Sequence, residues 1–313
     1  MTDHPRTAIL SAIDTLANDY LQGKVQAIKL AMICLLSGGH LLLEDIPGLG
    51  KTTLALALSK ALGLSFGRVQ CTSDLLPSDI TGLSIFDRNA NRFEFMEGPI
   101  FNNLLLADEI NRAMPKTQSA LLEAMEERRV TIEGNTYSLP DPFMVIATQN
   151  PVEQVGTYPL PESQLDRFMI TTGIGYPPET MEKIIIQSGS IRDSIRDITP
   201  LISHDQLLAA RHTVRTEVHL AEKITDYIYL LVSATRNHPM LLAGISTRGA
   251  ISLAETARAY AFLEERDYVL PEDIKALFLP VCAHRLIPGA DHETLDCKEL
   301  LRSLLDDTPV PLA

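Results

Sequence analysis

The sequence predicts an α/β protein, in which a core built on a parallel sheet is followed by a smaller all-helical domain. Three short apolar runs alternate with segments of helical periodicity in the first half of the chain, which is typical of a parallel sheet covered on both faces. A glycine precedes two prolines near residue 176, where we expect the domain boundary. Beyond it the periodicity is helical, so the predicted domains are residues 1–176 and 177–313.

Each predicted element follows from its own pattern of apolar and turn-forming residues. A helix ends at the glycine pair 38–39, and a buried strand then runs into a glycine-containing turn that opens a second helix. The predicted core elements are helices at 25–36, 52–62 and 115–129, strands at 41–43, 104–107 and 143–148, and hairpins at 85–100, with its tip at 89–91, and 130–137, turning at Gly134-Asn135. The predicted helices of the second domain are 179–187, 205–213, 221–235 and 248–263.

Composition and cysteine spacing argue against several classes of protein. The net charge is −13, from 27 Lys and Arg against 40 Asp and Glu, and no basic run stands out, which disfavours nucleic acid as the main partner. The four cysteines lie at no metal-ligand spacing and are too few for a disulfide scaffold. The apolar runs fall far short of the ~20 residues of a membrane span, and the N-terminus has no convincing signal peptide, so we expect a cytoplasmic protein.

A phosphate-binding loop is predicted between the first strand and the second helix. Residues 45–52 fit the pattern GxxxxGK[ST] except at the first position, which is Asp45. Gly48 and Gly50 permit backbone angles that turn successive N–H groups toward phosphate oxygens. Lys51 places a positive charge beside the β- and γ-phosphates, and the Thr52 hydroxyl is a ligand for Mg²⁺.

The alternative interpretation is a glycine-rich turn with an incidental lysine. The position of the motif between a buried strand and a helix favours nucleotide binding, because the helix N-terminus then points at the anion. Asp45 weakens the bare pattern, since a carboxylate close to phosphates is unfavourable unless it points away.

An acidic pair, Asp108 and Glu109, ends the next predicted strand. Ligands of open α/β sheets bind at the carboxyl ends of strands, so Asp108 is expected in the Mg²⁺ shell. Glu109 would orient or deprotonate the attacking water, which favours hydrolysis over binding alone. The alternative is that Asp108 only caps the following helix.

At this point the chain resembles the MoxR AAA+ ATPases from about Gly23 to its end. The segments that carry the resemblance are GGHLLLEDIPGLGKT (38–52), DLLPSDITG (74–82), ADEINRA (107–113), KTQSALLEAME (116–126), ATQNP (147–151) and LPESQLDRF (160–168). The resemblance implies an AAA+ P-loop core with a helical lid, binding ATP and Mg²⁺. It also makes Asp45 ordinary, and it places Pro47, Leu49 and Thr53 in the phosphate loop.

The resemblance assigns three further roles. Asn150 matches sensor 1, although an Asn-Pro turn is the alternative. Arg167 matches an arginine finger that acts on the neighbouring subunit's nucleotide; the alternative is a salt bridge with Asp166 or Glu162. Arg248 matches sensor 2 at the start of a lid helix and is expected to face the nucleotide, whereas the alternative is an exposed first-turn arginine.

Two departures and two insertions complete the comparison with the family. Gly23 and Lys24 stand where Gly-Gln is frequent and are expected to line the adenine site, and Ser246-Thr-Arg replaces the frequent Ser-Pro-Arg. The hairpins 85–100 and 130–137 correspond to the helix-2 insert and the pre-sensor-1 hairpin, which would line the pore or face of a ring.

The expected function is ATP-driven, chaperone-like remodelling or maturation of a client protein. An arginine acting in trans implies a homo-oligomer, by analogy a hexameric ring. The family suggests clients bearing von Willebrand factor A domains, and metal cofactor insertion as one theme. The alternatives are a magnesium-chelatase-like ATPase subunit, a nucleic-acid-stimulated ring motor and a non-catalytic nucleotide-gated scaffold.

Overall fold

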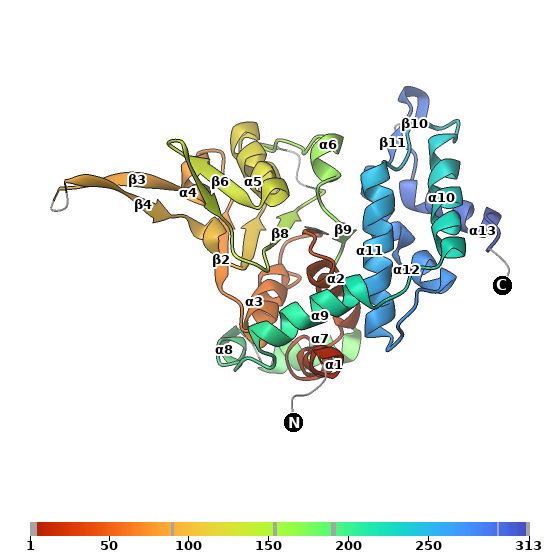
Figure 1. The fold of residues 1–313 in the computed structure, drawn as a ribbon, viewed down its shortest axis with the longest axis horizontal. Helices are drawn as coiled ribbons and strands as arrows, with labels where there is room; N and C mark the ends of the chain where they lie inside the picture. The colour runs from red at the N-terminus through yellow and green to blue at the C-terminus, as the bar shows by residue number, and fades with distance from the viewer. Residues whose placement is uncertain (1–4, 89–90, 153–154, 189–191, 293, 311–313) are drawn as a thin grey trace.

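The fold is built around a five-stranded parallel sheet with the strand order β2-β5-β8-β1-β9 (Figure 1). The computed structural model describes residues 5–88, 91–152, 155–188, 192–292 and 294–310. The strands are β1 (Leu41–Glu44), β2 (Phe66–Gln70), β5 (Leu104–Asp108), β8 (Met144–Gln149) and β9 (Ile170–Thr172). The three predicted core strands are confirmed. The pattern did not predict β2, whose alternate residues are exposed, or β9, which is only three residues long.

Helices cover both faces of this sheet, as an α/β core requires. In β1, Leu41 and Leu43 point into one hydrophobic cluster and Leu42 into the other, because successive strand side chains face opposite sides. The helices of the core are α1 (Pro5–Thr15), the π-helical turn η1 (Leu16–Tyr20), α2 (Val25–Leu36), α3 (Lys51–Ala61), α4 (Pro77–Thr81), α5 (Pro115–Glu127) and α6 (Glu162–Leu165), with 3₁₀ turns η2 (Pro99–Phe101) and η3 (Ile110–Arg112).

Both predicted hairpins are present. The β3 (Gly82–Asp87) and β4 (Arg92–Glu97) hairpin projects away from the body of the molecule (Figure 1), and residues 89–90 of its predicted tip lie outside the described residues.

The second hairpin joins β6 (Arg129–Ile132) to β7 (Asn135–Ser138). Its turn residues are Glu133 and Gly134, with φ of 51° and 81°, rather than the predicted Gly134-Asn135. A tight turn of this kind needs positive φ at both central residues, so Asn135 already belongs to β7.

The described residues of the C-terminal part are helical, apart from one short antiparallel pair, β10 (Leu241–Ala243) with β11 (Ile287–Pro288), and a single parallel bridge between His219 and Tyr268. Its helices are α7 (Glu179–Ser188), α8 (Arg192–Arg196), α9 (His204–Thr216), α10 (Glu222–Arg236), α11 (Thr247–Leu263), α12 (Pro271–Cys282) and α13 (Cys297–Asp307), with 3₁₀ turns η4 (Ala283–Arg285) and η5 (Ala290–His292). The α/β core followed by a helical lid is therefore confirmed.

The packing of α8 and α9 bears on the domain boundary. α8 contacts α3, and α9 contacts α1 and α2, so this part of the C-terminal half packs on the core. α11 and α12 also contact the core, through α2 and β9, while α10 and α13 lie farther from the sheet (Figure 1). The division at residue 176 stays a prediction. None of the helices that the structure describes combines the length and apolar character of a bilayer-spanning segment.

Candidate active site

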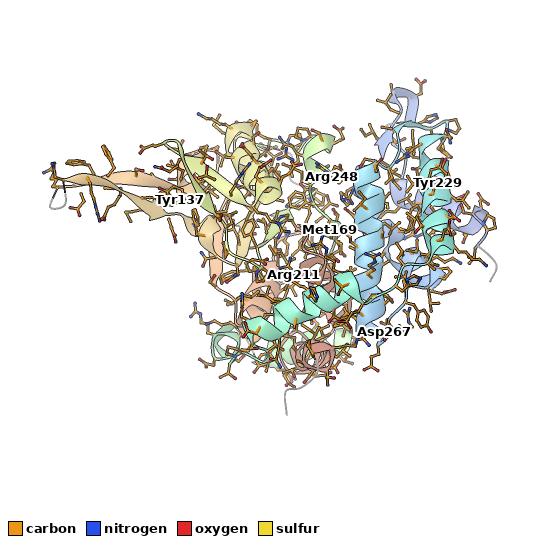
Figure 2. All side chains as sticks on the ribbon, viewed as in Figure 1. Tyr137, Met169, Arg211, Tyr229, Arg248 and Asp267 are labelled. Carbon is orange, nitrogen blue, oxygen red and sulfur yellow. The ribbon has the colours of Figure 1, made fainter. Side chains whose placement is uncertain are left out.

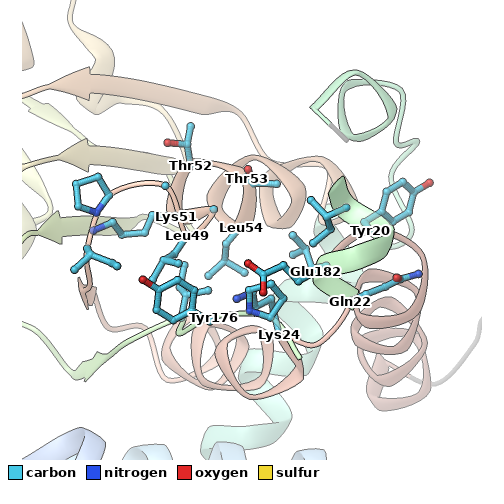
Figure 3. Close-up of a pocket in the computed structure, with 18 of the residues that line it drawn as sticks. Tyr20, Gln22, Lys24, Leu49, Lys51, Thr52, Thr53, Leu54, Tyr176 and Glu182 are labelled. Carbon is cyan, nitrogen blue, oxygen red and sulfur yellow. The ribbon is translucent and has the colours of Figure 1, made fainter. Parts of the chain in front are cut away.

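A cavity of about 840 Å³ opens at the carboxyl edge of the sheet (Figure 3). It lies between the predicted phosphate loop, the segment 19–24, the segment 174–177 and α7. The predicted site residues that line it are Lys24, Pro47, Gly48, Leu49, Gly50, Lys51, Thr52, Thr53, Asp108, Glu109 and Asn150. Among the described residues, four other predicted ones do not line it: Gly23, Asp45, Arg167 and Arg248. The fold thus brings both carboxylates and the loop to one place.

The loop has the backbone that phosphate binding needs. Gly48 and Gly50 adopt φ of 89° and 95°, in the left-handed region that glycine enters without strain, and α3 begins at Lys51. The Lys51 ammonium donates a hydrogen bond to the carbonyl oxygen of Asp45. Burial lowers the pKa of Lys51, and the nearby carboxylates of the site partly oppose this shift. A cation and a helix N-terminus therefore meet at one end of the cavity.

Asp45 is turned away from the loop. Its Oδ2 accepts hydrogen bonds from the backbone N–H groups of Ile174 (2.6 Å) and Gly175 (2.8 Å), which follow β9. The carboxylate that breaks the P-loop pattern therefore fastens the opposite wall of the cavity instead of facing phosphate, which removes the electrostatic objection to it.

The Asp108 carboxylate is held from two neighbouring strands. Its Oδ1 accepts from the Thr148 hydroxyl of β8 at 2.7 Å, and its Oδ2 forms an ion pair with Arg68 of β2 at 2.8 Å. These partners orient the carboxylate at the end of β5. Neither Arg68 nor Thr148 was recognised from sequence, because only the strand order places β2 and β8 on either side of β5.

Glu109 occupies a special backbone position. Its φ and ψ of 57° and 51° are left-handed, which is uncommon for a residue with a side chain, and its N–H donates to the Thr148 hydroxyl at 2.9 Å. Its Oε2 accepts from the Gln70 amide at 3.1 Å and pairs with Arg112 at 3.0 Å. Gln70 is a further residue that the sequence did not reveal; the register pairs it with Asp108 across β2 and β5.

The donor set suits Mg²⁺. Thr52 and Asp108 line the same cavity, and Mg²⁺ is usually bound by one or two protein oxygens, with waters and substrate phosphates completing the shell. Within the described ranges there is no group of three or more His, Cys, Asp or Glu side chains that could hold a metal alone. A hydroxyl and a carboxylate beside a phosphate loop fit that mode of binding.

Asn150 follows β8 and lines the cavity, as sensor 1 would. Its Oδ1 also accepts from the N–H of Val152 at 3.2 Å, so the Asn-Pro turn interpretation describes part of its role. The turn contact is therefore present in the structure, and the sensor 1 role of Asn150 stays a prediction.

Arg167 and Arg248 lie together, away from the cavity. Arg167 pairs with Glu126 at 3.2 Å, rather than with Asp166 or Glu162, and Arg248 pairs with the other oxygen of Glu126 at 2.5 Å. Figure 2 labels Arg248 at the end of α11 that faces α6. Arg248 does not line the cavity of its own chain, because the start of α11 contacts Asp166 and Glu126 of the core. Its role as sensor 2 stays a prediction.

The wall opposite the loop is apolar and aromatic. Tyr176, Pro177 and Ile174 line it, together with apolar residues of α7, and Lys24 donates a hydrogen bond to the Gly175 carbonyl (Figure 3). The Gly-Tyr-Pro-Pro segment that signalled a boundary thus also forms part of the site. Gly23 stands behind it: its φ is +76°, and an added Cβ would lie 2.4 Å from Cδ of Pro178.

The fold and sequence match those of known proteins over nearly the whole chain. The family described as ATPase family associated with various cellular activities (AAA) matches residues 40–170, and the AAA lid domain matches residues 233–303. A crystal structure described as that of an ATPase from Cytophaga hutchinsonii superposes with a TM-score of 0.89 at 39% identity, over 98% of this chain and 96% of that one.

The chain is also similar in sequence to known proteins. YeaC of Bacillus subtilis is 45% identical over 94% of this chain and 92% of its own length. Chaperone MoxR1 of Mycobacterium tuberculosis is 40% identical over 85% and 72%, and MoxR of Paracoccus denitrificans is 31% identical over 95% and 94%. With the cavity, the sheet order and the helical lid, these matches identify the chain as a member of the MoxR family of AAA+ ATPases.

Proposed function

We propose that this chain hydrolyses ATP with Mg²⁺ in the cavity at the carboxyl edge of the sheet. The observation that carries the proposal is that the phosphate loop, Asp108 and Glu109 line one cavity. The triphosphate would lie on the N–H groups of Gly48 to Thr53 and on Lys51. The adenine would lie against the apolar wall around Tyr176, near Lys24.

Each residue of the site would have a separate role in hydrolysis. Thr52 and Asp108 would hold Mg²⁺, which neutralises charge on the phosphates when bound. Glu109 would take the proton of the attacking water, and Asn150 would orient that water or a phosphate oxygen. In the structure of the free chain, Gln70 and Arg112 hold the Glu109 carboxylate. The hydrogen bond from Gln70 would therefore break when Glu109 takes the proton of the attacking water.

Arg167 and Arg248 would serve the site of a neighbouring subunit. They sit side by side outside the cavity of their own chain, which supports a role in trans for both rather than for Arg167 alone. Guanidinium groups stabilise charge on a transferring phosphoryl group. The functional unit would therefore be a homo-oligomer, for which a hexameric ring is the proposed form.

The work done by hydrolysis would be chaperone-like remodelling of a client protein, in which the projecting β3–β4 hairpin moves with the nucleotide state. The relative from Mycobacterium tuberculosis is named a chaperone. The net charge of −13 supports a protein client over nucleic acid. A client with a von Willebrand factor A domain, and metal cofactor insertion, remain family-level proposals.

Two substitutions test the chemistry of the site. Lys51→Ala should abolish nucleotide binding, because each charge-assisted contact to phosphate is worth roughly 1.5–3 kcal/mol. Glu109→Gln should bind ATP normally and lose turnover, because an amide cannot accept the proton. The measurements are titration with a fluorescent ATP analogue and steady-state phosphate release, with Glu94→Gln on β4 as a control. Turnover by Glu109→Gln near that of the wild type would overturn the assignment.

A mixing experiment tests the role in trans. Arg167→Ala should bind ATP but be inactive alone. Lys51→Ala should also be inactive alone, because it cannot bind nucleotide. In a mixed ring, an intact phosphate loop from the first variant meets an intact Arg167 from the second, so part of the activity should return and then fade on dilution. Absence of recovery, with subunit exchange shown independently, would mean that the arginine does not act on a neighbour.

A further inference from the structure

One carboxylate joins the two arginines. Glu126 lies in the last turn of α5, and its Oε1 and Oε2 each bind one guanidinium group, of Arg248 at 2.5 Å and of Arg167 at 3.2 Å. Glu126 belongs to α5 of the core, Arg167 follows α6, and Arg248 lies in the first turn of the lid helix α11. The contact is partly exposed: the side chains of Glu126, Arg167 and Arg248 keep 37%, 28% and 50% of their accessible surface.

Electrostatics explain why an anion is needed at this point. Two like charges held this close repel, and Arg248 lies in the first turn of a helix, where the dipole disfavours a cation. Glu126 offsets both effects, because a carboxylate between two guanidinium groups leaves a net charge of only about +1 for the three side chains. Without it, the two arginines would separate into solvent.

The backbone beside Arg167 is fixed independently. Asp166 pairs at 2.8 Å with Arg285, which is buried and also donates to the carbonyl oxygen of Phe168 at 2.8 Å. The Ser246 hydroxyl, which caps α11, lies 3.4 Å from the same Asp166 carboxylate. The start of α11 and the segment that carries Arg167 are thus held together. The two guanidinium groups can still change direction by rotation of their side chains.

We propose that Glu126 is a positioning residue, which holds Arg167 and Arg248 as one aligned pair that enters the neighbouring subunit's site together. The inference rests on the proposed action of these arginines in trans. An aligned pair loses little side-chain freedom when it meets a phosphate, whereas two separated arginines must be ordered during the reaction. Glu126 itself would touch neither the nucleotide nor the attacking water.

The substitution Glu126→Gln tests this role. The amide keeps the shape of the side chain, but it has no charge and only one oxygen that can accept a hydrogen bond from the two guanidinium groups. We expect kcat to fall about tenfold or more, since a small misplacement of a reacting group costs up to about a hundredfold. The KM for ATP and the affinity of the isolated subunit for a fluorescent ATP analogue should stay within about twofold, because Glu126 does not line the cavity. Glu126→Asp should restore part of kcat.

The matched control is Glu127→Gln. Glu127 is the next residue of α5 and has its own exposed ion pair, with Arg129 at 3.0 Å. We expect wild-type kcat for this variant, and unchanged thermal unfolding for both. A wild-type or raised kcat for Glu126→Gln would overturn the proposal, and so would a loss of ATP affinity or a lowered melting temperature that accounts for the loss of activity.

Mixing then shows on which side of the interface Glu126 acts. Glu126→Gln should recover activity with Lys51→Ala, which supplies intact arginines, but not with Arg167→Ala, which is defective on the same side. If Arg167→Ala recovers with Lys51→Ala and Glu126→Gln does not, the inference about Glu126 fails alone. If neither pair recovers, the proposal of action in trans fails, and the inference with it.

Discussion

The two hydrogen bonds of Asp45 predict how firmly one wall of the nucleotide cavity is held. The substitution Asp45→Asn keeps the size of the side chain but removes its charge from the contacts to the N–H groups of Ile174 and Gly175. We expect the segment that carries Tyr176 to loosen, and ATP to bind more weakly, although Asp45 is outside the cavity.

The magnitude follows from the two bonds. A hydrogen bond to a charged group contributes about 1.5–3 kcal/mol and a neutral one about 0.5–1.5 kcal/mol, so the substitution removes roughly 1 kcal/mol per bond. Two bonds give about 2 kcal/mol, which corresponds to a loss of up to about thirtyfold in affinity if the wall must reorder on binding. Solvent at the exposed Gly175 makes this an upper bound.

The assay is titration with a fluorescent ATP analogue, together with urea unfolding of the same proteins. Glu94→Gln, which changes an exposed carboxylate on the β3–β4 hairpin, is the control and should leave both measurements unchanged. If Asp45→Asn binds within twofold of the wild type and unfolds at the same urea concentration, the wall does not depend on this carboxylate and the reasoning is refuted.

Three further predictions follow from single contacts. Thr148→Val should lower kcat at least tenfold with little change in ATP affinity, because the hydroxyl donates to Asp108 and accepts from the N–H of Glu109; wild-type turnover would contradict it. Gly23→Ala should lower the melting temperature by several degrees, since a positive φ and a proline ring leave no room for a Cβ. Burial lowers the pKa of His40 to about 4, below its value of about 6.5 in the unfolded chain, so the unfolded chain binds more protons between these values and stability should fall as pH drops from 6.5 toward 4. Urea unfolding at pH 7 and pH 5 measures this fall, which should be smaller in His40→Gln.

The sequence by itself determined the parts of the protein that depend on neighbours along the chain. The strand, the glycines and Lys51 are consecutive, so their pattern was enough to predict the loop, its helix and the cavity end that they form. The Asp108-Glu109 pair was equally local, because the end of a buried parallel strand fixes where both side chains lie.

The tertiary structure alone decided the contacts between segments distant in the chain. Gln70 reaches Glu109 only because β2 lies next to β5. The order of strands in a sheet cannot be predicted from the sequence of any single strand. Asp45 turned out to hold the opposite wall, a contact across about 130 residues that no local pattern encodes.

The place of Arg248 shows the same limit most clearly. Its helix was predicted from local residues, but the direction of the side chain depends on how the lid docks on the core. Docking is set by many weak apolar contacts and by the buried ion pair of Arg285 with Asp166, which together bring Arg248 to Glu126. The sequence determined which side chains are available to the site. Packing decided which of these side chains come into contact, because the free energy gained by burial depends on surfaces that form only when the chain folds.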